Sequence, residues 1–190
     1  MNEQFFVTSP DDEEYLNACA EIIHNIDIPI TEERMFDLLQ IKKRWGRGSL
    51  ESINHCGRVS DSYYDGDGCL DFYKWKQIYD LGFTTHITDI LDLTEELREL
   101  DRRLFDLKGS RTVANLYFTK GSTSRRVSFP PHNHDYHVIV KPLYGSCLWQ
   151  VGEEVKEYGA GDLIMVPYGT MHCVHESKEP RLSLTVNLTG

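Results

Sequence analysis

The chain has 190 residues, 40% of them hydrophobic and 11% aromatic. This suits one domain, or a compact core with an added helical region, that folds without disulfides or a structural metal. Its formal net charge of -10 argues against nucleic acid as the main partner, because phosphate binding rests on clustered Lys and Arg. Five cysteines without a CxxC pair predict reduced thiols. Residues 1–6 lack the pattern of a signal peptide, and no apolar run approaches the roughly 20 residues of a membrane span. We therefore expect a cytoplasmic protein without a nucleic-acid or membrane partner.

Helical periodicity marks the N-terminal half of the chain. A helix is predicted to begin at Ser9-Pro10, and a second to run from Thr31 to about Arg44. A third follows the capping box at 92–95, carries a leucine stripe and ends at Gly109. Its stripe comprises Leu93, Leu97, Leu100, Leu104 and Leu107.

Residues 49–85 show no clear pattern. The acidic run 64–68 resembles a calcium loop only superficially, because the closing glutamate is absent, and a plain surface turn is the favoured interpretation. Trp75, Tyr79, Phe83 and Ile87 fit either a packed segment or a wall facing a substrate.

After Gly109 the sequence pattern changes to short segments rich in β-branched and aromatic residues. This pattern predicts a small antiparallel barrel or sandwich. The predicted strands are Thr112–Thr119, Arg126–Phe129, His137–Leu143, Cys147–Val151, Leu163–Val166 and Leu182–Leu188. We expect an α+β protein in which a helical region at 1–109 packs on a barrel at 110–190 as one cooperative unit.

Three histidines carry the strongest chemical signal. His132 and His134 are two residues apart, so on a strand both side chains face one side, and a neighbouring strand could bring His172 to the same place. Imidazole suits iron, zinc, copper or nickel, and three protein ligands leave positions open for substrate or oxygen. The alternative for any lone histidine is a structural hydrogen bond. We assign that role to His24, His55 and His86, and we expect His137 and His175 to lie outside the cluster.

These histidines sit in two segments that resemble the motifs of the cupin superfamily. The first is His132-Asn133-His134 through Gly145, and the second is Gly161-Asp162 through Pro167, Gly169 and His172. The resemblance covers roughly Val113 to Leu188 and implies a double-stranded β-helix. The usual cupin glutamate, expected near Val138, is missing, which separates the chain from the sugar-epimerising and storage members.

Within the superfamily the chain looks most like the JmjC-like and ribosomal-oxygenase-like 2-oxoglutarate hydroxylases, with Trp149-Gln150-Val151 in the place of their Trp-x-Val segment. Two positions depart from that pattern. His134 stands where those enzymes have a metal-binding aspartate, and Cys147 stands where they have the Lys or Arg that holds the co-substrate. A local bulge could bring the carboxylate of Asp135 to the metal instead.

A second anchor for the co-substrate is Arg181 with Ser183, because many other 2-oxoglutarate oxygenases carry Arg-x-Ser on the last barrel strand, at a similar distance after the distal histidine. A guanidinium fork binds a carboxylate through two parallel hydrogen bonds. The alternative is that Arg181 is an exposed turn residue after Glu179-Pro180. The resemblance thus implies an Fe(2+)-dependent oxygenase with His132, His134 and His172 as ligands and 2-oxoglutarate on Arg181 and Ser183. Molecular oxygen and a small-molecule or peptide substrate are its expected partners, and a homodimer is compatible with it.

Two other functions remain open at this point. The chain also resembles three-histidine thiol dioxygenases through His132, His134, Lys141 and Gly145, although their closing Ser-x-His-x-Tyr reads Ser183-Leu184-Thr185-Val186-Asn187. The other alternative is a metal-binding or ligand-binding cupin without catalysis.

Overall fold

The structure is a computed structural model that describes residues 10–41, 45, 48–54, 57–59, 62–121 and 129–188. The helices are α1 (Pro10–Asn25), α2 (Glu32–Gln40), α3 (Phe72–Asp80) and α4 (Glu95–Lys108). The strands before residue 120 are β1 (Leu50–Asn54), β2 (Gly57–Val59), β3 (Thr84–Thr88) and β4 (Val113–Thr119). Those after it are β5 (His137–Tyr144), β6 (Ser146–Val151), β7 (Glu154–Gly159), β8 (Ile164–Val166), β9 (His172–Glu176) and β10 (Arg181–Leu188).

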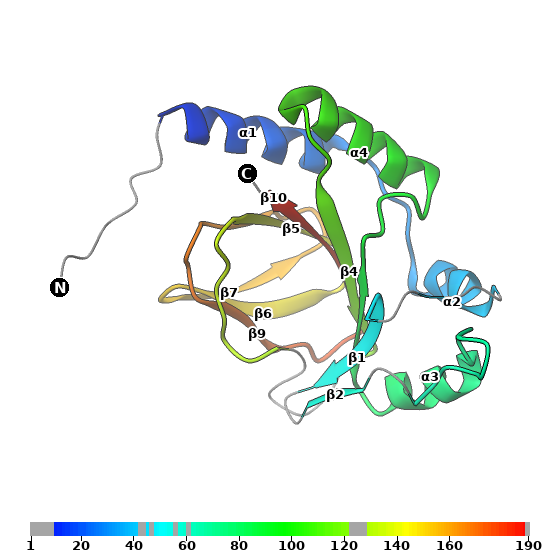
Figure 1. Cartoon of the computed structure of the whole chain (residues 1–190). Coiled ribbons are helices and arrows are strands. Elements are labelled where there is room, and N and C mark those ends of the chain that lie inside the picture. The colour runs from blue at the N-terminus through cyan, green and yellow to red at the C-terminus, as the bar shows by residue number, and fades with distance from the viewer. Residues whose placement is uncertain are drawn as a thin grey trace.

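Two antiparallel sheets face each other. The larger has the strand order β2-β1-β3-β4-β10-β5-β8, and the smaller has the order β7-β6-β9. Figure 1 shows the smaller sheet lying across from β5 and β10, so that the two sheets enclose a barrel. The inner strand β10 pairs with β4 on one side and with β5 on the other.

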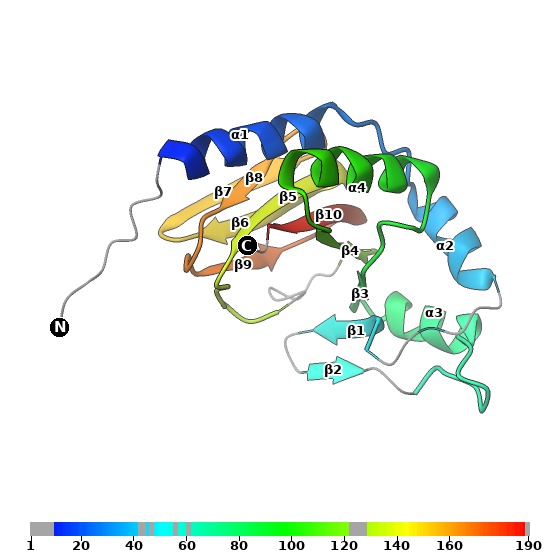
Figure 2. The same ribbon diagram turned by 45° about the horizontal axis from the view of Figure 1, so that its top comes forward.

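The helices cover the outer face of the larger sheet. Figures 1 and 2 show α1 and α4 together on one side of the barrel, while α3 lies next to β1 and β3. One continuous apolar cluster joins all four helices to β4, β5 and β10, and it contains Ile23, Leu100, Leu116 and Leu184. Because helices and sheet share this core, neither can bury its apolar face without the other.

Strand β10 shows how the sheet divides its residues. Leu182, Leu184 and Val186 belong to the apolar cluster under the helices, whereas Arg181, Thr185 and Asn187 line a cavity inside the barrel. This alternation is the period of two of an extended strand, and every residue of β10 is nonetheless buried. The apolar face of β10 packs under the helices, and its other face supplies polar groups to the interior of the barrel.

The α+β architecture predicted from the sequence is confirmed. Helix α4 begins after Thr94, whose side chain accepts a hydrogen bond from the amide of Leu97, and it ends at Gly109. Leu97, Leu100 and Leu104 are buried as expected, while Leu107 is 42% exposed. Helix α2 starts after Thr31 as predicted but ends at Gln40, because Ile41 is extended.

The sequence predicted helices before Gly109 and strands after it, but the structure also has strands before Gly109. Strands β1, β2 and β3 precede it, and β3 pairs directly with β4, so the larger sheet is built from both halves of the chain. In the segment Thr84–Thr88 only Ile87 is apolar, so the alternation that marks a strand does not show in its sequence. Strands β7 and β9 were also missed, the first because its residues are mostly exposed and charged. The predicted strand Arg126–Phe129 lies outside the described residues except for Phe129, which is not in a strand.

Residues 62–88 form packing elements. Trp75 and Tyr79 on α3 and Ile87 on β3 are fully buried, which selects the packed segment over a wall facing a substrate. The acidic run is a turn in which Asp65 Oδ1 accepts hydrogen bonds from the amides of Asp67 and Cys69. Among the described residues, no helix is both long and apolar enough to cross a membrane.

Candidate metal centre

The segment before β5 and the start of β9 lie side by side at one end of the barrel. The backbones of His132 and His172 exchange both hydrogen bonds of an antiparallel bridge, at 3.2 and 2.8 Å. The amide of Gly169 donates to the carbonyl of His134 at 2.9 Å, which ties the turn before β9 to the same segment. These contacts bring segments that are far apart in the sequence to one place.

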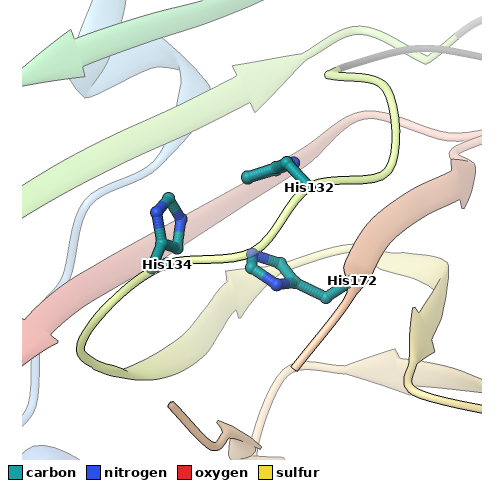
Figure 3. A group of neighbouring side chains, drawn as sticks. All are labelled: His132, His134 and His172. Carbon is teal, nitrogen blue, oxygen red and sulfur yellow. The ribbon is translucent and has the colours of Figure 1, made fainter. Parts of the chain in front are cut away.

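The structure brings the three predicted histidines together. The imidazoles of His132, His134 and His172 each offer a nitrogen, and these nitrogens lie within 4.8 Å of one another. Figure 3 shows the three rings converging, two from the segment before β5 and one from β9. The distances between ring centroids are 5.0 Å for His132–His134, 4.4 Å for His132–His172 and 5.2 Å for His134–His172.

Backbone carbonyls fix the tautomer of two of these rings. His132 Nδ1 lies 2.8 Å from the carbonyl oxygen of Pro130, and His172 Nδ1 lies 2.9 Å from that of Thr170. A carbonyl oxygen can only accept a hydrogen bond, so each Nδ1 must carry the proton. The unprotonated Nε2 atoms are then the nitrogens that can bind a metal, and the carbonyls orient both rings.

The surroundings also keep the imidazoles neutral. Burial lowers the pKa of His172 to about 4, and the neighbouring imidazoles of His132 and His134 act in the same direction. Burial is likewise the main cause of the lowered pKa of His134. A neutral ring has a free lone pair, so the cluster is ready to coordinate a cation at neutral pH.

A cavity of about 260 Å³ opens from the three histidines into the barrel. Its apolar wall is formed by Val138, Val140 and Val174. The indole of Trp149 lies nearly parallel to His172, with 6.3 Å between the ring centroids. The polar part of the lining comes from β3, β4 and β10, which belong to the same sheet as β5.

Arg181 lines this cavity and is only 2% exposed, so it is not an exposed turn residue. Its Nη1 donates a hydrogen bond of 3.0 Å to Ser183 Oγ. Its Nε and Nη2 are buried and have no hydrogen-bond partner within the described part of the chain. A buried guanidinium with two unused donors is suited to bind a carboxylate.

Several cavity residues were not singled out in the sequence. His86, assigned a structural role, lines the cavity together with Asn115, Tyr117, Thr185 and Asn187. Asn115, Tyr117, Thr185 and Asn187 lie on strands that were predicted, and their alternation with apolar residues was the only signal available. The cavity position of His86 could not be predicted, because β3 itself was not recognised.

Other candidate residues lie elsewhere. His137 Nδ1 accepts a hydrogen bond from the amide of Tyr168, and His175 Nε2 lies 2.7 Å from Gln150 Oε1, so both are outside the cluster as expected. Lys141 Nζ donates to the carbonyls of Ile23, His24 and Ile26 at the end of α1, on the face of β5 opposite the cavity. Asp135 is exposed and is not part of the cluster of metal-binding side chains found among the described residues.

Comparison with solved structures identifies the fold. The ribosomal oxygenase YcfD from Escherichia coli matches with a TM-score of 0.61 and 18% sequence identity, over 87% of this chain and 45% of that chain. The chain has the cupin fold. A structure of the same oxygenase in complex with cobalt and succinic acid matches with a TM-score of 0.61 and 16% identity, again over 87% of this chain and 45% of that chain. The expected resemblance to ribosomal-oxygenase-like cupins is therefore confirmed for the fold, and the chain spans less than half the length of the oxygenase chain.

Two further comparisons cover smaller parts of the chain. The family described as AraC-like ligand binding domain matches residues 120–187 of the chain. The DMSP lyase DddQ from Ruegeria pomeroyi matches with a TM-score of 0.35 and 21% identity, over 40% of this chain and 37% of that chain. No curated protein matches the chain in sequence.

Proposed function

We propose that this cupin is a non-haem Fe(II) oxygenase that couples the decarboxylation of 2-oxoglutarate to the hydroxylation of a further substrate. His132, His134 and His172 hold the metal, and Arg181 with Ser183 binds the distal carboxylate of 2-oxoglutarate. The observation that carries the proposal is that one cavity holds a three-imidazole cluster and a buried guanidinium with two nitrogens unpaired among the described residues.

The histidine cluster fits a divalent transition metal. Neutral imidazoles are preferred ligands of iron, zinc, copper and nickel, and two of the three have the Nδ1–H tautomer that leaves Nε2 free. Bound iron would supply the redox chemistry of the hydroxylation. With a third histidine in place of an aspartate, the protein contributes no negative charge to the metal, which favours an anionic co-substrate beside it.

The position of Arg181 fits a dicarboxylate that reaches from the metal into the barrel. Strand β10 runs antiparallel to β5, so Arg181 lies near Tyr144 at one end of the strand pair. Asn187 lies opposite Val138 at the other end, which is the end nearer to the three histidines. One carboxylate on Arg181 therefore directs the other end of the molecule towards the metal. Similarity in fold supports this choice, because the Escherichia coli ribosomal oxygenase has been solved with cobalt and succinic acid.

The rest of the cavity keeps the reacting groups in place. Trp149 and the valines of β5 contribute apolar surface to the cavity, and Ser183 fixes Nη1 of Arg181, which leaves Nε and Nη2 without a partner among the described residues. The backbone carbonyls of Pro130 and Thr170 hold the protons of His132 and His172 away from the metal. These residues would bind and orient the substrates beside the metal.

Succinate formation tests the proposal. The purified protein given Fe(II), ascorbate, oxygen and 2-oxoglutarate should produce succinate slowly without a further substrate, and His172→Ala and Arg181→Met should each reduce this rate at least tenfold. A Thr88→Val variant, changed in β3 outside the cavity, is the matched control and should retain the wild-type rate. No succinate, together with no calorimetric binding of 2-oxoglutarate, would contradict the proposal.

The thiol dioxygenase is the second candidate, because the metal-binding cluster among the described residues consists of three histidines and no carboxylate. The lysine of that resemblance does not support it, since the ammonium of Lys141 binds helix α1 instead of entering the cavity. Oxygen consumption with cysteine or 3-mercaptopropionate in the absence of 2-oxoglutarate would favour this candidate. Tight metal binding without any oxygen consumption would favour a cupin without catalysis.

A further inference from the structure

The polar wall of the cavity extends sideways from β10 across β4 to β3. His86 on β3 pairs with Tyr117 on β4, and Tyr117 pairs with Ser183 on β10, so the three residues form one row across the sheet. Asn115 lies two residues from Tyr117 on the same face and is paired with Thr185. His86 and Asn115 are therefore diagonal neighbours on the cavity side of the sheet.

Both side chains are buried, and each has polar atoms without a hydrogen-bond partner among the described residues, although the side chain of Asn115 also forms a hydrogen bond with Tyr117. His86 is 9% exposed and Asn115 is 8% exposed. Among the described residues, neither ring nitrogen of His86 has a hydrogen-bond partner, and nor does Oδ1 of Asn115. Buried polar atoms are nearly always paired, so unpaired ones on a cavity wall indicate a ligand that completes them.

The neighbours of His86 indicate which of its nitrogens faces the ligand. Glu51 is its cross-strand partner on β1, and Glu51 Oε2 lies 3.8 Å from His86 Nδ1, beyond hydrogen-bond distance. The same carboxylate is held by Arg58 through Oε1 at 3.2 Å. Its negative charge favours a proton on Nδ1, which leaves Nε2 as an acceptor.

Aromatic rings enclose this part of the cavity. The His86 ring stacks on Tyr117 with 4.4 Å between centroids and an interplanar angle of 12°. Phe129 meets His86 edge-on at 5.8 Å and lies 5.7 Å from His132. The His86–Asn115 wall is thus linked to the histidine cluster through a single ring.

2-Oxoglutarate cannot satisfy these acceptors. Its two carboxylates are ionised at neutral pH, so it only accepts hydrogen bonds, and it matches the donors of Arg181. His86 Nε2 and Asn115 Oδ1 require a partner with an N–H or O–H group. The cavity therefore presents donors at the Arg181 end and acceptors on the β3–β4 side.

We infer that His86 and Asn115 form the binding subsite for the primary substrate of the oxygenase, and that they bind a neutral amide or hydroxyl group that donates hydrogen bonds. This inference rests on the proposed function for the identity of the second ligand at Arg181. A neutral group is favoured because the described residues that line the cavity include Arg181 and no carboxylate. An anionic group would bind at Arg181 instead.

Acetamide and acetate provide an isosteric pair of probes that differ in the hydrogen-bond donor. In NMR titrations of the whole chain loaded with zinc and saturated with 2-oxoglutarate, acetamide should shift the ring ¹⁵N signals of His86 and the side-chain amide of Asn115. Acetate should leave both unchanged. Equal shifts from acetamide and acetate would overturn the inference, as would release of acetamide by 2-oxoglutarate.

Substitutions of His86 and Asn115 test whether acetamide binds at these two residues. His86→Phe and Asn115→Leu should each weaken acetamide binding about fivefold, as expected for one lost hydrogen bond, while their affinity for 2-oxoglutarate stays within about twofold of wild type. Val155→Thr, which changes an exposed residue of β7, is the control and should bind acetamide as wild type does. Acetamide binding that persists in both cavity variants would refute the subsite. If 2-oxoglutarate fails to bind but acetamide still shifts His86 in the wild type, the subsite stands and the proposed co-substrate is wrong.

Discussion

Arg181 holds a positive charge in the protein interior without a carboxylate beside it among the described residues. The guanidinium is 2% exposed, and its only hydrogen bond to a described residue goes to the neutral hydroxyl of Ser183. A buried charge that lacks a partner lowers the free energy of unfolding, so the protein is less stable without ligand than it would be with an apolar residue at this position. Such a residue is expected where a bound anion supplies the missing charge.

Replacing Arg181 by methionine should therefore stabilise the protein while it removes ligand binding. Methionine fills a similar volume and removes the uncompensated charge, so we expect the free energy of unfolding of the ligand-free protein to rise by about 1–2 kcal/mol. Urea unfolding followed by circular dichroism measures this change. A loss of more than about 1 kcal/mol would show that the guanidinium has a stabilising partner in the ligand-free fold.

The two carbonyl-bound histidines allow a second prediction at this scale. His172→Gln keeps a polar side chain but offers no imidazole nitrogen, and it should weaken zinc binding by at least tenfold. Competition with a chromogenic chelator measures the affinity, and His175→Gln is the matched control because His175 lies outside the cluster. Equal zinc affinity of the two variants would exclude His172 as a ligand.

At the scale of elements, the tight turn between β5 and β6 fixes where β10 begins. Gly145 has a φ of +69°, and a Cβ atom placed on it would lie 2.1 Å from the carbonyl oxygen of Pro180. Only glycine allows this close approach of the turn to the residue before Arg181. The glycine of the first cupin-like motif therefore positions the proposed anion-binding arginine.

Gly145→Ala should destabilise the protein strongly, by roughly 3 kcal/mol or more, because the methyl group meets backbone atoms that cannot move independently. Gly109→Ala is the matched control. Gly109 also has a positive φ of +75°, but no atom of a described residue lies within 4 Å of the place that a methyl group would take, so only about 1 kcal/mol of strain is expected. Chemical denaturation compares the two, and equal losses would contradict the steric role of the turn.

The elements also show how far the sequence alone could lead. Helices α1, α2 and α4 and most barrel strands followed from capping residues, apolar stripes and alternation, and the histidine cluster followed from a spacing of two residues on one segment. Strand β3 could not be predicted, because Thr84, Thr85 and Thr88 carry no apolar alternation. His86 was consequently interpreted as structural, since its cavity position depends on long-range pairing with Tyr117 that leaves no local signature.

At the scale of the whole molecule, stability should depend on pH through His86. Burial lowers the pKa of His86 to about 4, with a further contribution from the charge of Arg58, against an ordinary value of 6.5. The fold thus favours the neutral ring. The contribution of this ring to the free energy of unfolding is fully present above pH 6.5 and is lost as the pH falls towards 4. Between about pH 7 and pH 5, the metal-free wild type should lose roughly 2 kcal/mol more unfolding free energy than His86→Phe. Parallel urea unfolding curves of the two proteins at each pH make the comparison, and identical pH dependence would contradict it.

The shared core predicts that the protein unfolds as one unit. Residues of α1, α4 and β10 belong to a single apolar cluster, so residues 110–190 alone would expose the outer face of the sheet. We expect the whole chain to show coincident near- and far-ultraviolet circular dichroism transitions and the fragment 110–190 to remain unfolded. Two separated transitions would indicate that the helical region and the barrel are independent.

The central claim is that one cavity holds a metal on three histidines and a dicarboxylate on Arg181. Isothermal titration of 2-oxoglutarate into the zinc-loaded protein tests it most directly, with Arg181→Met and Arg181→Lys measured beside the wild type. We predict one binding site in the wild type, a loss of about 100-fold in Arg181→Met, and a smaller loss in Arg181→Lys, which keeps the charge but not the fork. Equal affinity of all three proteins, or no binding to the wild type, would contradict the account.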